Sequence, residues 1–90
     1  MLHPIEPHAG WKVNLAAPQQ RWTFTDNSGL MATARFAGHF VEAITDDAGG
    51  FYLMYLGFQA KGYATMDEAK AAAPEFALRV LQRMSDLIAN

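Results

Sequence analysis

Two turn-forming segments constrain the fold of this chain more than any other feature. They are "DNSG" at 26–29 and "TDDAGG" at 45–50, and each stands between stretches rich in aromatic and other apolar residues. Asn, Asp and Gly favour tight turns, because their side chains cap backbone amides or because they accept positive φ angles. The segment from 11 to 59 is therefore predicted to form an antiparallel sheet built from hairpins.

The stretches around these turns show the two-residue alternation of β-strands. Apolar and polar residues alternate in "WKVNLA" at 11–16 and in "QRWTFT" at 20–25. From Leu30 the alternation continues and then loses its phase, which predicts a bulge near Ala37–Gly38 in one long strand. With the apolar run at 51–58, the pattern predicts a meander of three to four strands.

One amphipathic helix is predicted over 66–88. Thr65 and Glu68 have the spacing of a capping box, in which Glu68 reaches back to the amide of Thr65. Apolar residues then recur at three- and four-residue steps. Pro74 lies inside this pattern and removes one backbone hydrogen bond, which predicts a kink or a break into two helices. The unbroken apolar stripe favours the kink.

These elements predict a single small α+β domain with the helix packed on one face of the sheet. Its parts are an extended arm at 1–10, an antiparallel sheet at 11–59 and the helix at 66–88. Pro4 and Pro7 keep the arm out of helices and central strands. The helix is expected to pack on Trp22, Phe24 and one face of 51–58 through Phe76, Val80, Leu81 and Met84.

The composition excludes several classes of function. The chain of 90 residues has no cysteine, so thiolate metal sites, disulfides and cysteine nucleophiles are ruled out. His3, His8 and His39 stand in no metal-binding motif, and no glycine-rich phosphate loop is present. We expect neither a cofactor nor a metal, and we expect a protein that is not an enzyme.

The N-terminal sequence lacks the basic start and continuous apolar stretch of a signal peptide, and no segment has the length of a membrane span. We therefore expect a cytoplasmic protein without a membrane partner. The net charge of −2, with scattered basic residues, gives no electrostatic reason to bind nucleic acid.

The run "GGFYLMYLGF" at 49–58 is the strongest indication of a binding surface. In one strand it would place apolar residues on both faces, whereas the helix can cover only one of them. The second face is expected to carry Tyr52, Met54, Leu56 and Phe58. It could be covered by the arm through Leu2, Ile5 and Trp11, by a second copy in a two-fold dimer, or by a foreign partner.

The sequence thus predicts a non-enzymatic protein-binding or adaptor protein that acts through an apolar sheet face, with a homodimer as the expected assembly. The alternative is a nucleic-acid-binding module that stacks bases on the sheet aromatics. The junction "KGYATMDEAKAA" at 61–72 is similar to the hairpin-then-helix junctions of small phage proteins and of AP2-like domains in some phage integrases. That similarity follows from general turn and capping chemistry and implies no site residues, but the small size also suits a phage or mobile-element accessory factor.

Overall fold

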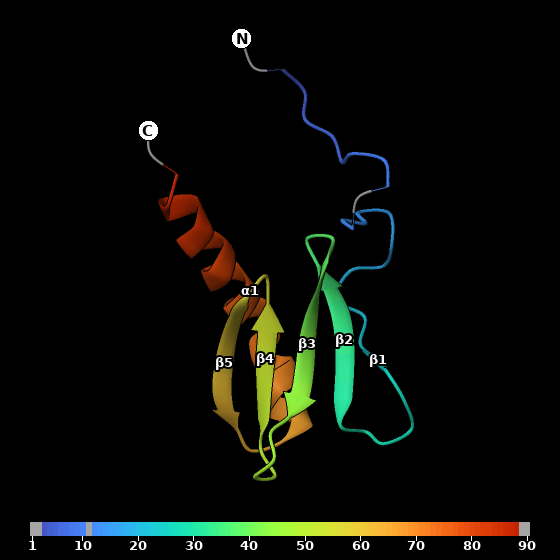
Figure 1. The fold of residues 1–90 in the computed structure, drawn as a ribbon, viewed down its shortest axis with the longest axis vertical. Coiled ribbons are helices and arrows are strands. Elements are labelled where there is room, and N and C mark those ends of the chain that lie inside the picture. Colours follow the sequence, from blue (N-terminus) through green and yellow to red (C-terminus); the bar gives the residue numbers. More distant parts are fainter. Residues whose placement is uncertain (1–2, 11, 89–90) are drawn as a thin grey trace.

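The computed structural model of the protein, which describes residues 3–10 and 12–88, is a five-stranded antiparallel meander followed by one helix (Figure 1). The strands lie side by side in chain order. The elements are β1 (Thr23–Phe24), β2 (Met31–Phe36), β3 (His39–Thr45), β4 (Phe51–Tyr55), β5 (Phe58–Tyr63) and α1 (Met66–Asp86). The predicted α+β class and meander are confirmed, but the predicted number of three to four strands is too low.

Two short turns account for the difference in strand number. Ala37 and Gly38 have φ angles of 52° and 87°, and Leu56 and Gly57 have φ angles of 50° and 87°. Two successive positive φ angles define the two-residue turn whose twist matches an antiparallel hairpin. The loss of phase near Ala37–Gly38 is therefore a chain reversal between β2 and β3 and not a bulge in one strand.

The second of these turns divides the apolar run. β4 ends at Tyr55, the chain reverses at Leu56–Gly57, and Phe58 begins β5 directly opposite Tyr55. A leucine at a positive φ angle is uncommon, so this turn is hard to predict from the sequence. The sheet consequently extends to Tyr63, beyond the predicted limit at 59.

The predicted strand at 11–16 does not form in residues 12–16, and Trp11 lies outside the described residues. The backbone amides of Ala16 and Ala17 donate to the side-chain oxygen of Asn14, which bends the chain. The amide of Asn14 itself donates to the carbonyl oxygen of Gly38 at 3.0 Å. The segment is thus anchored at the β2–β3 turn instead of joining the sheet.

Asp26 and Asp46 organise the two turns that the sequence predicts. The carboxylate of Asp26 accepts a hydrogen bond from the amide of Ser28, and that of Asp46 accepts from the amides of Ala48 and Gly50. The turn between β1 and β2 and the turn between β3 and β4 are therefore where the sequence places them.

α1 begins as predicted and is continuous through Pro74. The Thr65 hydroxyl accepts from the amide of Glu68 at 3.1 Å, while the Glu68 carboxylate accepts from the amide of Ala64, one residue before the expected Thr65. A break at Pro74 is excluded. The helix ends at Asp86, with Leu87 as its C-cap.

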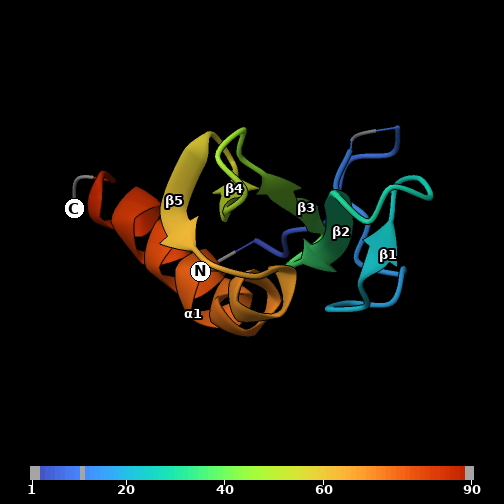
Figure 2. The same cartoon turned by 90° about the horizontal axis from the view of Figure 1, so that it is seen from below.

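The helix covers one face of the sheet and packs mainly on β3, β4 and β5 (Figure 2). The core between them is formed by small helix residues and larger strand residues, namely Ala69, Ala73, Ala77 and Val80 against Ala34, Phe36, Val41, Ala43, Leu53 and Tyr55. Met84 and Leu87, which the sequence places on the same stripe, are exposed because the end of α1 runs past the sheet.

Phe76 lies on the side of α1 that faces β5. The indole of Trp22 instead lies 6.1 Å from the ring of Phe36, and the ring of Phe24 lies 4.5 Å from the Lys70 ammonium. Of the expected helix packing, Val80 joins the core with Leu53 and Tyr55 of the run at 51–58, whereas Leu81 and Met84 are exposed. Within the described residues, no helix has the length and apolar character needed to cross a membrane.

Candidate functional site

The face of the sheet opposite α1, here called the outer face, carries side chains from all five strands. Its positions follow from the strand register and are Thr23, Met31, Thr33, Arg35, Phe40, Glu42, Ile44, Tyr52, Met54 and Gln59. They form cross-strand rows, one of which is Met31, Ile44 and Tyr52. Side chains directly opposite each other on neighbouring strands are in contact range, so this row is a continuous apolar strip.

The outer face contains two of the four predicted interface residues. Tyr52 and Met54 lie on it and are half-buried. Leu56 and Phe58 do not lie on it, because the reversal at Leu56–Gly57 places Phe58 opposite Tyr55, on the helix side. Both of these side chains pack against the core. The four residues therefore do not share one face, and their role as an interface stays a prediction.

The sequence pattern did not assign Met31, Phe40 and Ile44 to the second face of the sheet. Phe40 is the most exposed large apolar residue of β3, with 49% of its surface accessible. The alternation from Phe40 to Ile44 was visible in the sequence, but Val41 and Ala43 offered an equally apolar alternative. Only the register of β3 against β2 and β4 decides that Val41 and Ala43 face α1.

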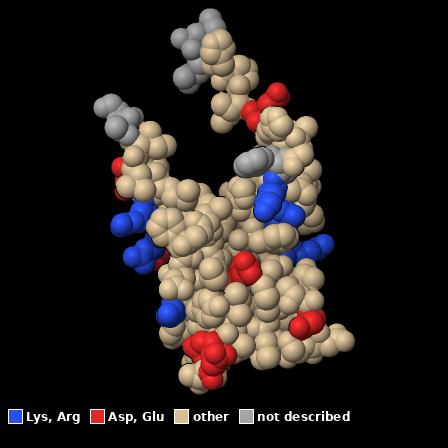
Figure 3. All heavy atoms as spheres, viewed as in Figure 1, with Lys and Arg blue, Asp and Glu red and all other residues tan. Residues whose placement is uncertain are grey.

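The charged groups of the outer face lie beside its apolar strip. Arg35 stacks on the ring of Phe40 with its guanidinium carbon 4.1 Å from the ring centre, and its Nη1 donates to the carbonyl oxygen of Gly38. Glu42 lies between Thr33 and Met54 in the neighbouring row. Figure 3 shows this side of the molecule as mainly uncharged, with basic groups toward its margins.

The N-terminal arm leaves the apolar strip open as far as it is described. Ile5 is 97% exposed, and residues 3–10 are all exposed. Leu2 and Trp11, the other residues of the expected arm contact, lie outside the described residues. The segment after the arm reaches only one corner of the face, where Ala17, Pro18 and Arg21 line a cleft of about 330 Å³ with Arg35 and Phe40.

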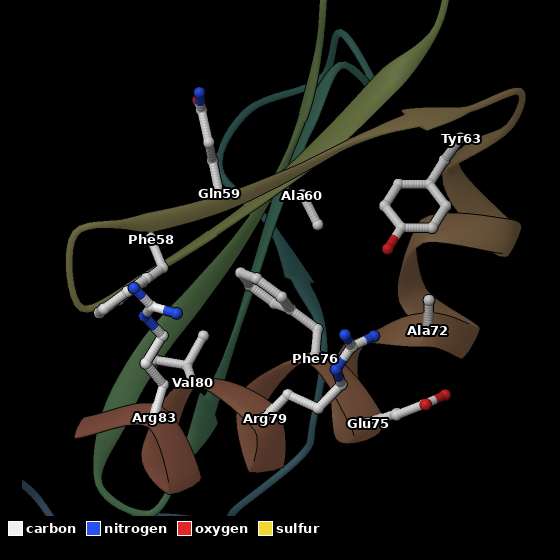
Figure 4. A pocket seen from close by; sticks show the side chains of 10 residues that line it. All are labelled: Phe58, Gln59, Ala60, Tyr63, Ala72, Glu75, Phe76, Arg79, Val80 and Arg83. Carbon is white, nitrogen blue, oxygen red and sulfur yellow. The ribbon is translucent and has the colours of Figure 1, made fainter. Parts of the chain in front are cut away.

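A second concave surface lies between β5 and α1 (Figure 4). Its volume is about 330 Å³, and its lining residues are Phe58, Gln59, Ala60 and Tyr63 from β5 with Ala72, Glu75, Phe76, Arg79, Val80 and Arg83 from α1. We call it the β5–α1 cleft. The sequence offered one signal for it, the pair Arg79 and Arg83 at a four-residue spacing next to the apolar stripe.

The potential catalytic and metal-binding groups lie in separate segments. His3 and His8 lie in the exposed arm, whereas His39 lies at the start of β3. Among residues 3–10 and 12–88 there is no group of three or more His, Cys, Asp or Glu residues that could hold a metal ion. The absence of a cofactor and of enzymatic activity stays a prediction.

Comparisons of the chain with protein-family models, with curated proteins and with solved structures give no match. The outer face and the β5–α1 cleft are therefore interpreted from their own geometry. The assignment to phage or mobile-element accessory factors stays a prediction from the sequence.

Proposed function

We propose that this protein is a non-enzymatic protein-binding domain that acts through the outer face, and that a second copy of the chain covers this face. The observation that carries the proposal is the apolar strip of Met31, Ile44 and Tyr52, with Phe40 and Met54 beside it, on the sheet face opposite α1. The open face of an antiparallel sheet is normally polar, and an apolar one is typical of an interaction site.

The charges of the outer face support a second copy as its occupant. Arg35 and Glu42 lie in adjacent rows of the same face. In a two-fold interface each patch meets an identical patch, so a face that carries both signs of charge can pair opposite charges across the interface. A face with a single sign of charge would repel its own copy.

A dimer through the outer face must bury enough surface to be stable. Stable interfaces bury roughly 800 Å² per partner, and apolar burial contributes about 25 cal/mol per Å². The proposed dimer therefore has to bury most of the outer face, and with its apolar strip buried we expect it to persist at micromolar concentrations.

Light scattering across a dilution series tests the proposal. The wild type is expected to be a dimer, and Met54→Lys is expected to be a folded monomer because it places a charge at the centre of the contact. Met84→Lys is the matched control, since Met84 is exposed on the part of α1 that runs past the sheet. A wild type that stays monomeric at high concentration, or a dimer that Met54→Lys leaves intact, would contradict the proposal.

The alternative function is nucleic-acid binding at the corner of the outer face where Arg21 and Arg35 lie beside the ring of Phe40. An aromatic ring next to cations is the arrangement that binds unpaired bases and phosphates. Glu42 on the same face and the net charge of −2 favour the protein-binding function instead. Retention on single-stranded DNA that weakens steeply with salt, and that Arg35→Gln abolishes, would favour the alternative.

A further inference from the structure

β5 is an edge strand whose outer side has no neighbouring strand in the described structure. The sheet order ends at β5, and this edge has six residues, whereas β1 at the other edge has only two. Every second residue of an edge strand turns its backbone N–H and C=O away from the sheet. Such groups can pair with an added strand.

The register identifies which part of β5 offers these groups. Tyr55 and Phe58 flank a two-residue turn and so form a hydrogen-bonded pair, after which bonded and non-bonded pairs alternate. The backbone of Gln59 therefore faces the free edge. Beyond Ala60 the register shifts against β4, and Gly62 has a φ of 97°. This irregularity confines strand pairing to the first half of β5.

The β5–α1 cleft lies alongside this first half. Phe58, Ala60 and Phe76 are half-buried and Val80 is buried, so the floor of the cleft is apolar. An added strand would point alternate side chains toward the helix side, over this floor. The cleft therefore offers a pocket for apolar side chains of a strand paired with β5.

The rim of the cleft is cationic. Arg79 and Arg83 are exposed, and in Figure 4 their guanidinium groups point toward the cleft while the carboxylate of Glu75 points away from them. Guanidinium groups bind carboxylates through short, charge-assisted hydrogen bonds. Pairing of β5 with β5 of a second copy would bring two such cationic rims together, so an acidic partner fits this edge better than a second copy.

From these features we infer that β5 and the β5–α1 cleft bind an extended acidic segment of a partner protein by β-strand addition. The segment pairs with the backbone of Gln59, places an apolar side chain on the cleft floor near Phe76, and places an acidic side chain two residues further along at Arg79 and Arg83. The two-residue spacing is required because only alternate side chains of a strand share a face. This surface meets the outer face at Gln59, but the inference does not depend on the dimer.

Fluorescein-labelled nonapeptides test the inference by anisotropy titration. The first peptide has the sequence Thr-Val-Thr-Val-Thr-Glu-Thr-Glu-Thr, so that Val and Glu share one face of the strand. In the second, lysine replaces glutamate, and in the third the glutamates are shifted by one residue to the other face. The first peptide is expected to bind with a Kd below about 1 mM, and the other two at least about tenfold more weakly.

Variants of the protein locate the binding. The double variant Arg79→Gln/Arg83→Gln and the edge variant Gln59→Pro, which removes the outward N–H, should each weaken binding of the first peptide at least about tenfold. Lys12→Gln/Arg21→Gln removes the same charge away from the cleft and should leave binding unchanged. In the wild type, exchange of the Gln59 amide hydrogen should slow when this peptide is bound, which tests the pairing even if Gln59→Pro does not fold.

Three results would overturn the inference. The first is no binding of the acidic peptide at about 1 mM. The second is binding that needs the two arginines but leaves exchange of the Gln59 amide unchanged, which would mean that the cleft binds a carboxylate without strand pairing. The third is self-association through β5 that Gln59→Pro abolishes, which would make a second copy the occupant of this edge.

Discussion

The phenol of Tyr55 donates a 2.6 Å hydrogen bond to the carbonyl oxygen of Phe36. Tyr55 ends β4 and Phe36 ends β2, so the bond reaches across β3, which lies between them. Tyr55 is 1% exposed and is one of the largest fully buried side chains. The bond therefore links the ends of β2 and β4. These ends lie next to the turns at Ala37–Gly38 and Leu56–Gly57, which were not predicted from the sequence.

Removal of this hydroxyl should destabilise the fold. Tyr55→Phe keeps the ring in the core but removes one of the hydrogen bonds that the carbonyl of Phe36 accepts, since Phe36 also pairs with His39 across the two-residue turn. We expect a loss of about 0.5–1.5 kcal/mol in the free energy of unfolding, measured by urea denaturation. Tyr52→Phe is the control, because Tyr52 lies on the outer face and should change stability much less. Equal losses in the two variants would contradict the role of the bond.

The same residue predicts how stability depends on alkaline pH. Burial raises the pKa of the Tyr55 phenol above its ordinary value of 10.0. As the pH rises above about 10, the unfolded chain loses a proton that the folded chain retains, so the free energy of unfolding falls. Tyr55→Phe should therefore lose less stability than the wild type between about pH 9 and pH 11. Denaturation curves with identical pH dependence would show that Tyr55 ionises equally in both states.

Leu53 and Phe76 should differ in their contribution to the core. Leu53 is fully buried between the sheet and α1, whereas Phe76 is half-buried at the β5–α1 cleft. We expect Leu53→Ala to cost about 2–5 kcal/mol and Phe76→Ala to cost clearly less than the about 3–5 kcal/mol of a fully buried aromatic ring. Chemical denaturation of both variants measures the difference. A larger loss for Phe76→Ala would place that residue at the centre of the core.

Substitutions of Gly38 and Gly57 test whether the N-terminal segment packs on the β2–β3 turn, because the two glycines share one backbone conformation but differ in their surroundings. Both have a φ of 87°, but a Cβ atom at Gly38 would collide with the side chains of Val13 and Leu15, whereas one at Gly57 would meet nothing within 4 Å. Gly57→Ala should cost about 1–2 kcal/mol from backbone strain alone. Gly38→Ala should cost at least about 1 kcal/mol more and should speed proteolysis of residues 12–20. Equal effects would show that this segment is not docked at the turn.

Pro74 should be unfavourable for the helix that contains it. α1 is continuous through Pro74, which is exposed and lacks the N–H that would bond to the carbonyl of Lys70. We expect Pro74→Ala to leave the free energy of unfolding equal or higher, because restoring that bond offsets the greater freedom of the unfolded chain. Thermal unfolding together with amide exchange near residue 74 measures this. A marked loss of stability would mean that Pro74 has a packing role.

The features that the sequence predicted correctly depend on local interactions. The start of α1 follows from Thr65 and Glu68, whose side chains bond amides within four residues. The turns at Asp26 and Asp46 follow from carboxylates that bond amides two to four residues away. Such contacts need no other part of the molecule, so their residues are visible as short patterns.

Only two of the four residues predicted for the second sheet face lie on the outer face, because the others depend on a turn with a weak signal. Leucine has no preference for positive φ, so Leu56–Gly57 resembled the interior of a strand. A reversal at that point changes the face of every residue after it. Tyr52 and Met54 precede the reversal and kept their predicted face, whereas Phe58 follows it and did not.

The sequence by itself determined the α+β class, the meander and the helix, because alternation, capping and turn chemistry operate over a few residues. Only the tertiary structure decided the strand register, the composition of the outer face and the existence of the β5–α1 cleft. Val41 and Phe40 are both apolar, and only pairing with β2 and β4 assigns one to the core and the other to the surface. Arg79 and Arg83 likewise become the rim of a cleft only because α1 packs beside the edge strand β5. Contacts between residues distant in the chain fix these features, and no short pattern in the sequence encodes them.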